Sequence, residues 1–145
     1  LGLVGSEMCI RDSEEGVADR CELVGLVPRD KTPQFMNDCD CFICSSHTET
    51  LSCVLNECAA CGRPAISTLC GGPQDIITPE TGLLVPVNNA AAMADAMQKM
   101  LDTAHTYDRE RIRAVTVERF GRDSVCDRLV SACEDTITQW KEKQG

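Results

Sequence analysis

The sequence has 145 residues, in which 14 Lys and Arg stand against 23 Asp and Glu, for a formal net charge of −9. That length fits one domain with a moderate core, and the acidic balance excludes the concentrated positive charge needed to bind nucleic acid or an anionic membrane. Aromatic residues make up only 3% of the chain, so an aromatic platform for single-stranded nucleic acid is not expected. No apolar run approaches the roughly 20 residues of a membrane-spanning helix.

Cysteine is over-represented, with 11 residues in the chain. An odd number cannot be paired completely within one chain, and disulfide-rich secreted domains are usually shorter and lack the helices predicted below. We therefore expect reduced cysteines that fill the core of a cytoplasmic protein.

Several cysteines lie close enough in the sequence to make a Cys-rich metal-binding protein one alternative. Cys41 and Cys44 fall in a predicted buried strand, where their side chains would not converge, so we expect no metal site. Cys58 and Cys61 have a C-x-x-C spacing, but activation of such a thiol needs a helix N-terminus, and this pair lies at a predicted C-terminus. The cysteines that a metal-binding protein could use as ligands are Cys39, Cys41, Cys44, Cys58 and Cys61.

The first residues look foreign to the rest of the chain. Residues 7–13 resemble a translated sequencing adapter, because the codons ATG-TGT-ATA-AGA-GAC followed by AG would encode Met8 to Asp12 and then Ser13. We expect residues 1–13 to be a non-native or disordered leader without the apolar segment of a signal peptide. On that interpretation the native sequence begins near Glu14, and residues 14–145 form a domain truncated at its N-terminal side.

Short apolar runs alternate along the chain with segments of helical character. The runs are too short for helices and are bounded by Gly, Pro or Ser, so they predict buried strands. In chain order, the predicted elements are a strand at 23–27, a helical turn at 33–37, a strand at 41–44, a helix at 52–61, a strand at 65–68, at most one turn at 75–77, a strand at 82–85, a helix capped by Asn88 or Asn89, and helices at about 108–120 and 123–141.

Two of the later helices carry apolar stripes at helical spacing, which usually face a core. The first stripe consists of Met93, Met97, Met100 and Leu101. The second consists of Val125, Leu129, Cys133, Ile137 and Trp140.

Strands that alternate with helices predict an α/β fold with a parallel sheet covered on both faces. Such sheets bind ligands in the loops that follow the carboxyl ends of their strands. The candidate loops are therefore 45–52, 69–73 and the turn after Val27.

The loop at 45–52 leads into a helix in a way that suits a nucleotide. If the helix begins near Ser52, the backbone N–H groups of Ser52, Cys53 and Val54 are unpaired within it and form an anion site. Glu57 then lies about a turn and a half into the helix, where its carboxylate could accept two hydrogen bonds from the vicinal hydroxyls of a ribose. Glu49, in the loop, would border the same cleft. A pair of carboxylates at this spacing also arises easily by chance in an acidic chain.

Residues 45–68 resemble the nucleotide-sugar-binding core of retaining glycosyltransferases of family 4, which have the GT-B fold of two facing Rossmann-like domains. The family pattern is Ser, a short loop, Glu, seven residues, Glu, and then Ala-Cys-Gly-x-Pro before an apolar strand. Glu49 and Glu57 match the two glutamates, and residues 70–77 and 81–87 resemble the blocks that follow. The chain departs from the pattern at Cys58, where Ala is usual, and at Thr50 and Ser52, where small residues, often Gly, are usual.

The resemblance covers about residues 21–138 and implies an α/β fold: an incomplete Rossmann-like parallel sheet, the carboxy-terminal half of a GT-B domain, followed by three helices. It implies a hexosyltransferase-type reaction in which a sugar passes from a nucleotide-diphosphate donor to an acceptor with retention, without a further cofactor. Glu49 is the catalytic candidate beside the donor sugar, and Glu57 would hold the ribose. The other donor-binding residues implied are Thr50, Leu51, Ser52 and Cys53, with His47, Gly71 and Gly72 as further candidates for the donor pocket.

The resemblance also implies partners. The acceptor, a saccharide or lipid-linked saccharide, would bind the amino-terminal GT-B domain of a parent enzyme that is cytoplasmic or peripheral at the inner face of the membrane. In such enzymes an Arg and a Lys from earlier in the domain reach the diphosphate, and Arg63 and Lys31 do not occupy those places. We therefore expect the isolated chain to be inactive; a non-catalytic nucleotide-sugar-binding remnant is the alternative.

Overall fold

The computed structural model describes residues 14–22 and 24–143, and the described residues divide into two compact units at the boundary between Thr32 and Pro33. Among its described residues, the first unit includes the short 3-10 helix η1 (Ala18–Arg20). The strand predicted at 23–27 is wrong for residues 24–27, which form no strand, and residue 23 lies outside the described residues. Gly25 has a φ of +70°, which is not extended, and a strand requires a hydrogen-bonded neighbour, which the described residues do not supply to this segment.

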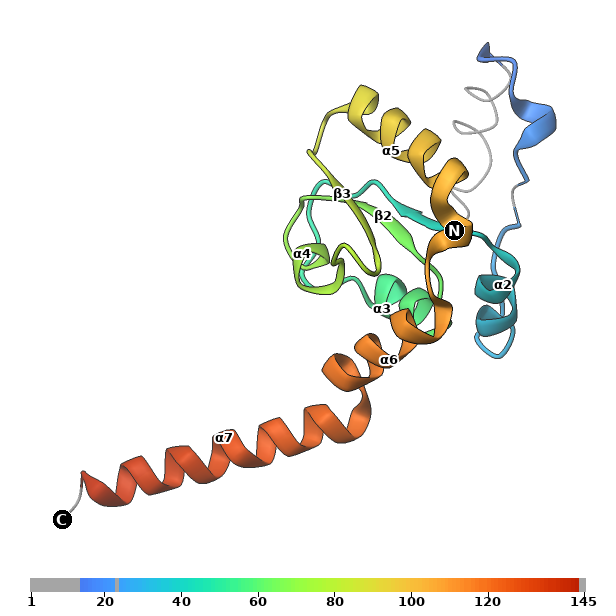
Figure 1. Ribbon diagram of the computed structural model, residues 1–145. Helices are drawn as coiled ribbons and strands as arrows, with labels where there is room; N and C mark the ends of the chain where they lie inside the picture. The colour runs from blue at the N-terminus through green and yellow to red at the C-terminus, as the bar shows by residue number, and fades with distance from the viewer. Residues whose placement is uncertain (1–13, 23, 144–145) are drawn as a thin grey trace. The chain divides into compact units, whose positions relative to one another are not determined.

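The second unit is built on a parallel sheet of three strands in the order β1-β2-β3 (Figure 1). These strands are β1 (Phe42–Cys44), β2 (Ala65–Thr68) and β3 (Gly82–Val85). In the register, Ile43 pairs with Ile66, and Ile66 pairs with Leu83. All three lie where the sequence predicts strands, although β1 begins one residue later than predicted. The predicted α/β class with a parallel sheet is confirmed.

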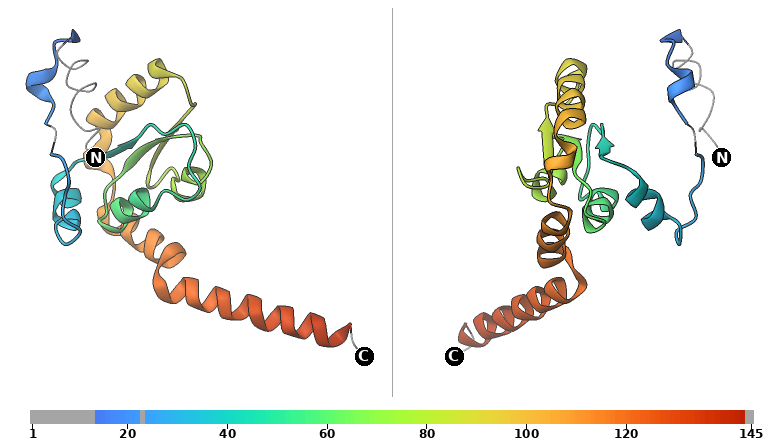
Figure 2. Two further views of the ribbon diagram at one scale, coloured as in Figure 1. Left: turned by 180° about the vertical axis from the view of Figure 1, so that it is seen from behind. Right: turned by 45° about the vertical axis from the view of Figure 1, so that its right-hand side comes forward.

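Helices follow each strand, as the alternating pattern predicts. The long helix at the C-terminus, α7, extends away from the sheet in every view (Figures 1 and 2). The helices in chain order are α2 (Thr32–Asp38), α3 (Cys53–Ala60), α4 (Pro73–Ile76), α5 (Ala90–Thr103), the 3-10 helix η2 (Ala104–Thr106), α6 (Arg109–Phe120) and α7 (Arg122–Glu142). None of the helices within 14–143 is long and apolar enough to cross a membrane.

The sheet separates two apolar clusters, because successive side chains of a strand point to opposite faces. On one face Leu55 of α3 packs with Ala65, Ile76 and Ile77. On the other face Ala96 and Met100 of α5 pack with Ile66 and Val85. Figure 1 shows α3 and α5 on the two sides of the sheet. Both faces of the sheet therefore contribute to the core, and β2 is buried along its whole length.

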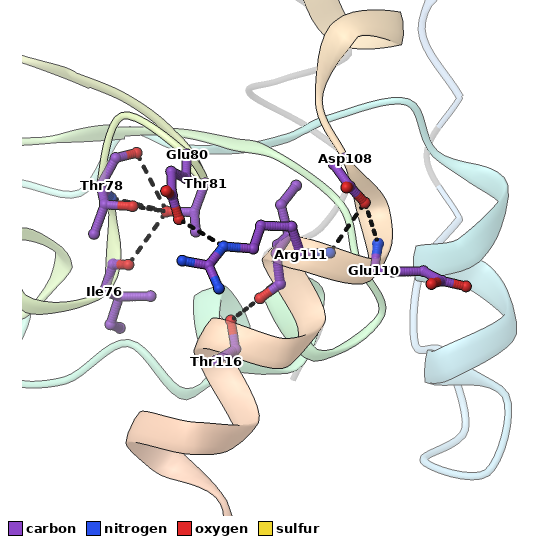
Figure 3. Close-up of polar contacts among 9 residues, drawn as sticks. Ile76, Thr78, Glu80, Thr81, Asp108, Glu110, Arg111 and Thr116 are labelled. Carbon is purple, nitrogen blue, oxygen red and sulfur yellow. Dashed lines mark hydrogen bonds and ion pairs between the residues drawn. The ribbon is translucent and has the colours of Figure 1, made fainter.

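The ends of the helices are set by capping residues. The side chain of Asn89 accepts a hydrogen bond from the N–H of Ala92 at 3.0 Å and so caps α5. Asp108 caps α6 by accepting from the N–H groups of Glu110 and Arg111, each at 3.0 Å (Figure 3). Gly121 separates α6 from α7, as the sequence predicts.

The turn before β3 is fastened to α6. The hydroxyl of buried Thr81 accepts a hydrogen bond from the N–H of Thr78 at 2.8 Å and lies 3.3 Å from the carbonyl oxygen of Ile76 (Figure 3). Glu80 forms an ion pair with Arg111 of α6 at 3.1 Å. Both partners of that pair are more than half exposed, so the buried hydroxyl matters more than the ion pair for the stability of the turn.

The two apolar stripes pack less than predicted. In α5, Met100 is buried, but Met97 is 43% and Leu101 77% exposed. No residue of α7 is buried, and Leu129 and Trp140 are 61% and 62% exposed. The periodicity correctly predicts the helix α7, but the prediction that its stripe lies in a core is wrong, because only α6 makes extensive contact with it among the described residues.

Candidate functional site

The loops that follow β1 and β2 are joined by backbone hydrogen bonds. The N–H of Glu49 donates to the carbonyl oxygen of Cys70 at 3.0 Å, and the N–H of Gly72 donates to the carbonyl oxygen of Glu49 at 2.9 Å. These bonds form an isolated parallel bridge between Glu49 and Gly71. Two of the three loops predicted to bind a ligand therefore meet at the carboxyl ends of the strands; the third, after Val27, lies in the other unit.

Two glycines allow this close approach of the loops. A Cβ atom at Gly71 would lie 2.5 Å from the carbonyl oxygen of Glu49, and one at Gly72 would lie 2.4 Å from that of Thr50. Gly71 also has a φ of +115°, which side chains rarely adopt. Both glycines, which the sequence places with His47 among the donor-pocket candidates, thus allow the backbone that carries Glu49 to lie close to the neighbouring loop.

The Glu49 side chain is held by a hydrogen bond from a residue of the same loop. The hydroxyl of Ser46 donates a hydrogen bond to Oε1 of Glu49 at 2.9 Å, and both residues are partly buried. The hydroxyl of Thr68, at the end of β2, donates in turn to the carbonyl oxygen of Ser46. The second carboxylate oxygen of Glu49 has no hydrogen-bond partner among the described residues.

Immediately after this loop, α3 begins with uncapped backbone donors. Its N-cap, Ser52, has a φ of 58° and a ψ of 74°, and its side chain makes no capping hydrogen bond. The carbonyl oxygen of Ser52 accepts from the N–H of Leu55 at 3.1 Å, whereas the described residues offer no acceptor to the N–H groups of Cys53 and Val54. Free N–H groups and the positive end of the helix dipole together attract an anion. The left-handed backbone of Ser52 also explains why small residues suit this position.

Glu57 lies on the exposed surface of α3, and no hydrogen bond joins it to Glu49. It borders a cavity of about 190 Å³ between α3 and the end of α6, which Phe120 also lines. No hydrogen bond joins its carboxylate to another described residue, so both lone-pair edges are open to a ligand. The other residues implied as donor contacts have exposed side chains beside this loop: His47, Thr50, Leu51 and Cys53.

A larger cavity, of about 410 Å³, lies elsewhere and includes residues just before β1 and β2, such as Asp40 and Pro64. Arg63 is one of its lining residues, and its guanidinium donates to the backbone carbonyl of Asn37. Arg63 therefore belongs to the amino ends of the strands, as its position after the helix predicts, and not to the anion site at the start of α3.

The cysteines from Cys39 to Cys133 are thiols, and no three of the His, Cys, Asp and Glu side chains described come together as metal ligands. Burial raises the pKa of Cys58 to about 12 and that of Cys41 to about 11. A thiol with a raised pKa is a weaker metal ligand and nucleophile at neutral pH, because the thiolate is the reactive form.

Sequence reasoning missed the roles of Ser46 and Thr68. Thr68 is the last residue of one predicted strand and Ser46 lies just after another, and Ser46 stands three residues before Glu49, which is the available signal. The contact itself depends on the way the loop folds back toward the end of β2, and no local pattern predicts that.

Comparison with known proteins shows the family to which the chain belongs. The family model described as "Glycosyl transferases group 1" matches residues 1–103. The D-inositol 3-phosphate glycosyltransferase of Acidothermus cellulolyticus is 27% identical over 125 residues, which are 86% of this chain and 28% of that protein. The GDP-mannose-dependent alpha-mannosyltransferase of Mycobacterium tuberculosis is 36% identical over 99 residues, 66% of this chain and 25% of that protein.

Among solved structures, that of Anabaena HepE in complex with UDP superimposes with a TM-score of 0.79 at 19% identity, covering 89% of this chain and 36% of HepE. The chain belongs to the group 1 glycosyltransferases, and its fold is that of the carboxy-terminal domain of the GT-B architecture. It spans about a third or less of the length of these relatives. The resemblance in residues 45–68 is thereby confirmed.

Proposed function

We propose that this chain is the part of a retaining glycosyltransferase that binds a nucleotide-diphosphate sugar. The observation that carries the proposal is the junction of the loops after β1 and β2. It fixes the backbone of Glu49 at the carboxyl ends of a parallel sheet, and the uncapped N-terminus of α3 follows shortly after Glu49 in the chain. Family membership and the solved neighbour with bound UDP support it.

The anionic part of the donor fits the start of α3. A departing diphosphate gains negative charge as the glycosidic bond breaks, and the free N–H groups of Cys53 and Val54 stabilise such charge. Thr50 and Leu51, whose side chains are exposed, come just before these donors in the chain. Ser52 in its left-handed conformation turns the backbone from the loop into the helix.

The two glutamates then bind the remaining parts of the donor, one the sugar and the other the ribose. Glu49 lies beside the donor sugar, where its negative charge favours the oxocarbenium character of the transition state. Glu57, farther along α3, accepts hydrogen bonds from the ribose hydroxyls. His47, Gly71 and Gly72 complete the donor pocket.

The whole enzyme needs parts that lie outside the described residues. The acceptor, a saccharide or lipid-linked saccharide, binds the facing GT-B domain, and basic side chains from earlier in this domain reach the diphosphate. The chain alone accordingly binds the donor weakly and transfers no sugar.

Calorimetric titration of the full chain tests this proposal. UDP-glucose is one probe, because HepE has also been solved with it, and GDP-mannose is the other, because the mycobacterial relative is named for it. We expect weak binding of at least one of them, reduced by Glu49→Gln and unchanged by Glu134→Gln on the exposed surface of α7. Binding of neither donor at millimolar concentration contradicts the proposal.

A further inference from the structure

The Glu49 carboxylate is anchored at one of its two oxygens. Oε1 accepts from the hydroxyl of Ser46 at 2.9 Å, and that hydroxyl also lies 3.4 Å from the thiol sulfur of Cys44 at the end of β1. Because Oε1 has a donor and the second oxygen has none among the described residues, the second oxygen is the one available to a ligand.

Ser46 is itself fixed to the sheet. The hydroxyl of Thr68, in the buried strand β2, donates to its carbonyl oxygen, so the backbone of Ser46 is tied to the end of the neighbouring strand. The chain of contacts therefore runs from β2 through Thr68 and Ser46 to the carboxylate of Glu49. Each link is a hydrogen bond between partly buried groups, where competition from water is reduced.

Such an anchor is needed because backbone contacts do not fix a glutamate side chain. The bonds from Glu49 to Cys70 and Gly72 hold its backbone, but the three side-chain torsions remain free to rotate. A carboxylate that meets a sugar must be held in one orientation before the donor binds, or the cost of ordering it reduces the affinity.

We propose that Ser46 is a positioning residue for Glu49: its hydroxyl holds Oε1 so that the other carboxylate oxygen faces the donor sugar. This inference rests on the proposed role of Glu49. It predicts a selective effect, because Ser46 acts through a residue that meets the sugar and not the nucleotide. Loss of the hydroxyl lowers the affinity for a nucleotide sugar and leaves the affinity for the nucleoside diphosphate unchanged.

The test uses the full chain and three substitutions at one position. Ser46→Ala removes the hydroxyl, Ser46→Cys replaces it with a weak donor of similar shape, and Ser46→Thr retains it. Ser131→Ala on the exposed surface of α7 is the matched control. Calorimetry compares UDP with UDP-glucose and GDP with GDP-mannose, and carbon-13 NMR of labelled glutamate follows the side-chain carboxyl signal of Glu49 without any ligand.

We expect Ser46→Ala and Ser46→Cys to shift the Glu49 carboxyl signal and to weaken binding of the nucleotide sugar by about fivefold, the factor that corresponds to one ordinary hydrogen bond. Ser46→Thr and Ser131→Ala should behave as the unmodified chain. If Ser46→Ala does not fold, Ser46→Cys and Ser46→Thr still provide the comparison.

An unchanged Glu49 signal in the hydroxyl-free variants overturns the inference even if donors bind. Equal losses for the nucleoside diphosphate and its sugar also overturn it, because they indicate a general disturbance of the loop. A shifted Glu49 signal in a chain with no affinity for either sugar supports the positioning of Glu49 by Ser46 and contradicts the proposed function instead.

Discussion

At the scale of single residues, Glu57 offers a direct test of the donor-binding assignment, because the described residues provide its carboxylate with no hydrogen bond or ion pair. Its replacement should therefore affect a ligand without disturbing the fold. Glu57→Gln should weaken donor binding by about 1–3 kcal/mol, the scale of a hydrogen bond to a charged group. Calorimetry with UDP-glucose and GDP-mannose measures this loss, or the donor KM in a longer enzyme that contains this domain.

The matched control for Glu57 is Glu134→Gln, which removes the same charge from an exposed position on α7. Equal donor affinity in the Glu57 variant and the unmodified chain would reject the ribose-binding role. A loss of stability in the Glu57 variant, measured by urea unfolding, would show that the residue has a structural role that the described contacts do not reveal.

The buried thiols allow a second prediction at this scale. Burial raises the pKa of Cys58 to about 12, so at neutral pH almost none of it is thiolate, and its side chain is shielded from reagents, whereas Cys53 is exposed. We expect iodoacetamide to label Cys53 much faster than Cys58 in the folded chain at neutral pH, as measured by mass spectrometry of peptides. Because the raised pKa lies above that of an ordinary thiol, the difference should persist as the pH rises to about 9.

In concentrated guanidinium chloride both thiols become exposed, and their labelling rates should converge, which serves as the control for intrinsic peptide effects. Fast labelling of Cys58 in the folded chain would contradict its burial. It would also make a redox role for the Cys58–Cys61 pair worth testing.

At the scale of elements, α6 depends on its N-cap. Asp108 accepts hydrogen bonds from two backbone N–H groups at the start of the helix, and α6 packs against α3. Asp108→Ala should lower the free energy of unfolding by about 1 kcal/mol, the usual value of such a cap. Urea unfolding followed by circular dichroism measures the change. Asp108→Asn retains a capping acceptor and should remain within about 0.5 kcal/mol, and an equal loss in both variants would attribute the effect to charge.

The helices and strands also show which features a sequence pattern can predict and which it cannot. The strands predicted at 41–44, 65–68 and 82–85 form because each finds a hydrogen-bonded neighbour in the sheet. The run at 24–27 has comparable apolar character but no such neighbour among the described residues, and Leu26 is 96% exposed. Propensity and periodicity indicate which side chains of a segment can be buried. A strand also requires a neighbouring strand, and an apolar stripe requires a surface to pack against. No local sequence pattern predicts whether that neighbour is present.

The same limit applies to the candidate site. The sequence predicts the loops, the start of α3 and both glutamates, because these depend on motif spacing and on the order of strands and helices. The contact between Ser46 and Glu49 depends on tertiary folding of the loop, and the place of Glu57 beside a cavity lined by α6 depends on the packing of α3 against α6. The motif therefore identifies the residues, and the fold determines how they are oriented.

At the scale of the whole molecule, the two apolar clusters consist entirely of residues that follow residue 33. The segment at 1–13 lies outside the described residues, and its origin as a translated adapter stays a prediction. If that origin is correct, these residues were never selected to stabilise the domain. Removing residues 1–13 should then leave the free energy of unfolding within about 0.5 kcal/mol of the full chain, the range of changes that touch no specific interaction.

Urea unfolding of the chains 1–145 and 14–145 measures this difference, and Ile66→Ala calibrates the assay. Ile66 is fully buried between β2 and α5, so its truncation should cost about 2–5 kcal/mol and prove that the measurement detects a loss of core packing. A loss of more than about 1 kcal/mol on deletion of residues 1–13 would show that they pack against the domain, because uninvolved residues do not contribute that much. Such a result would count against the adapter interpretation and would place the native start of the domain before Glu14.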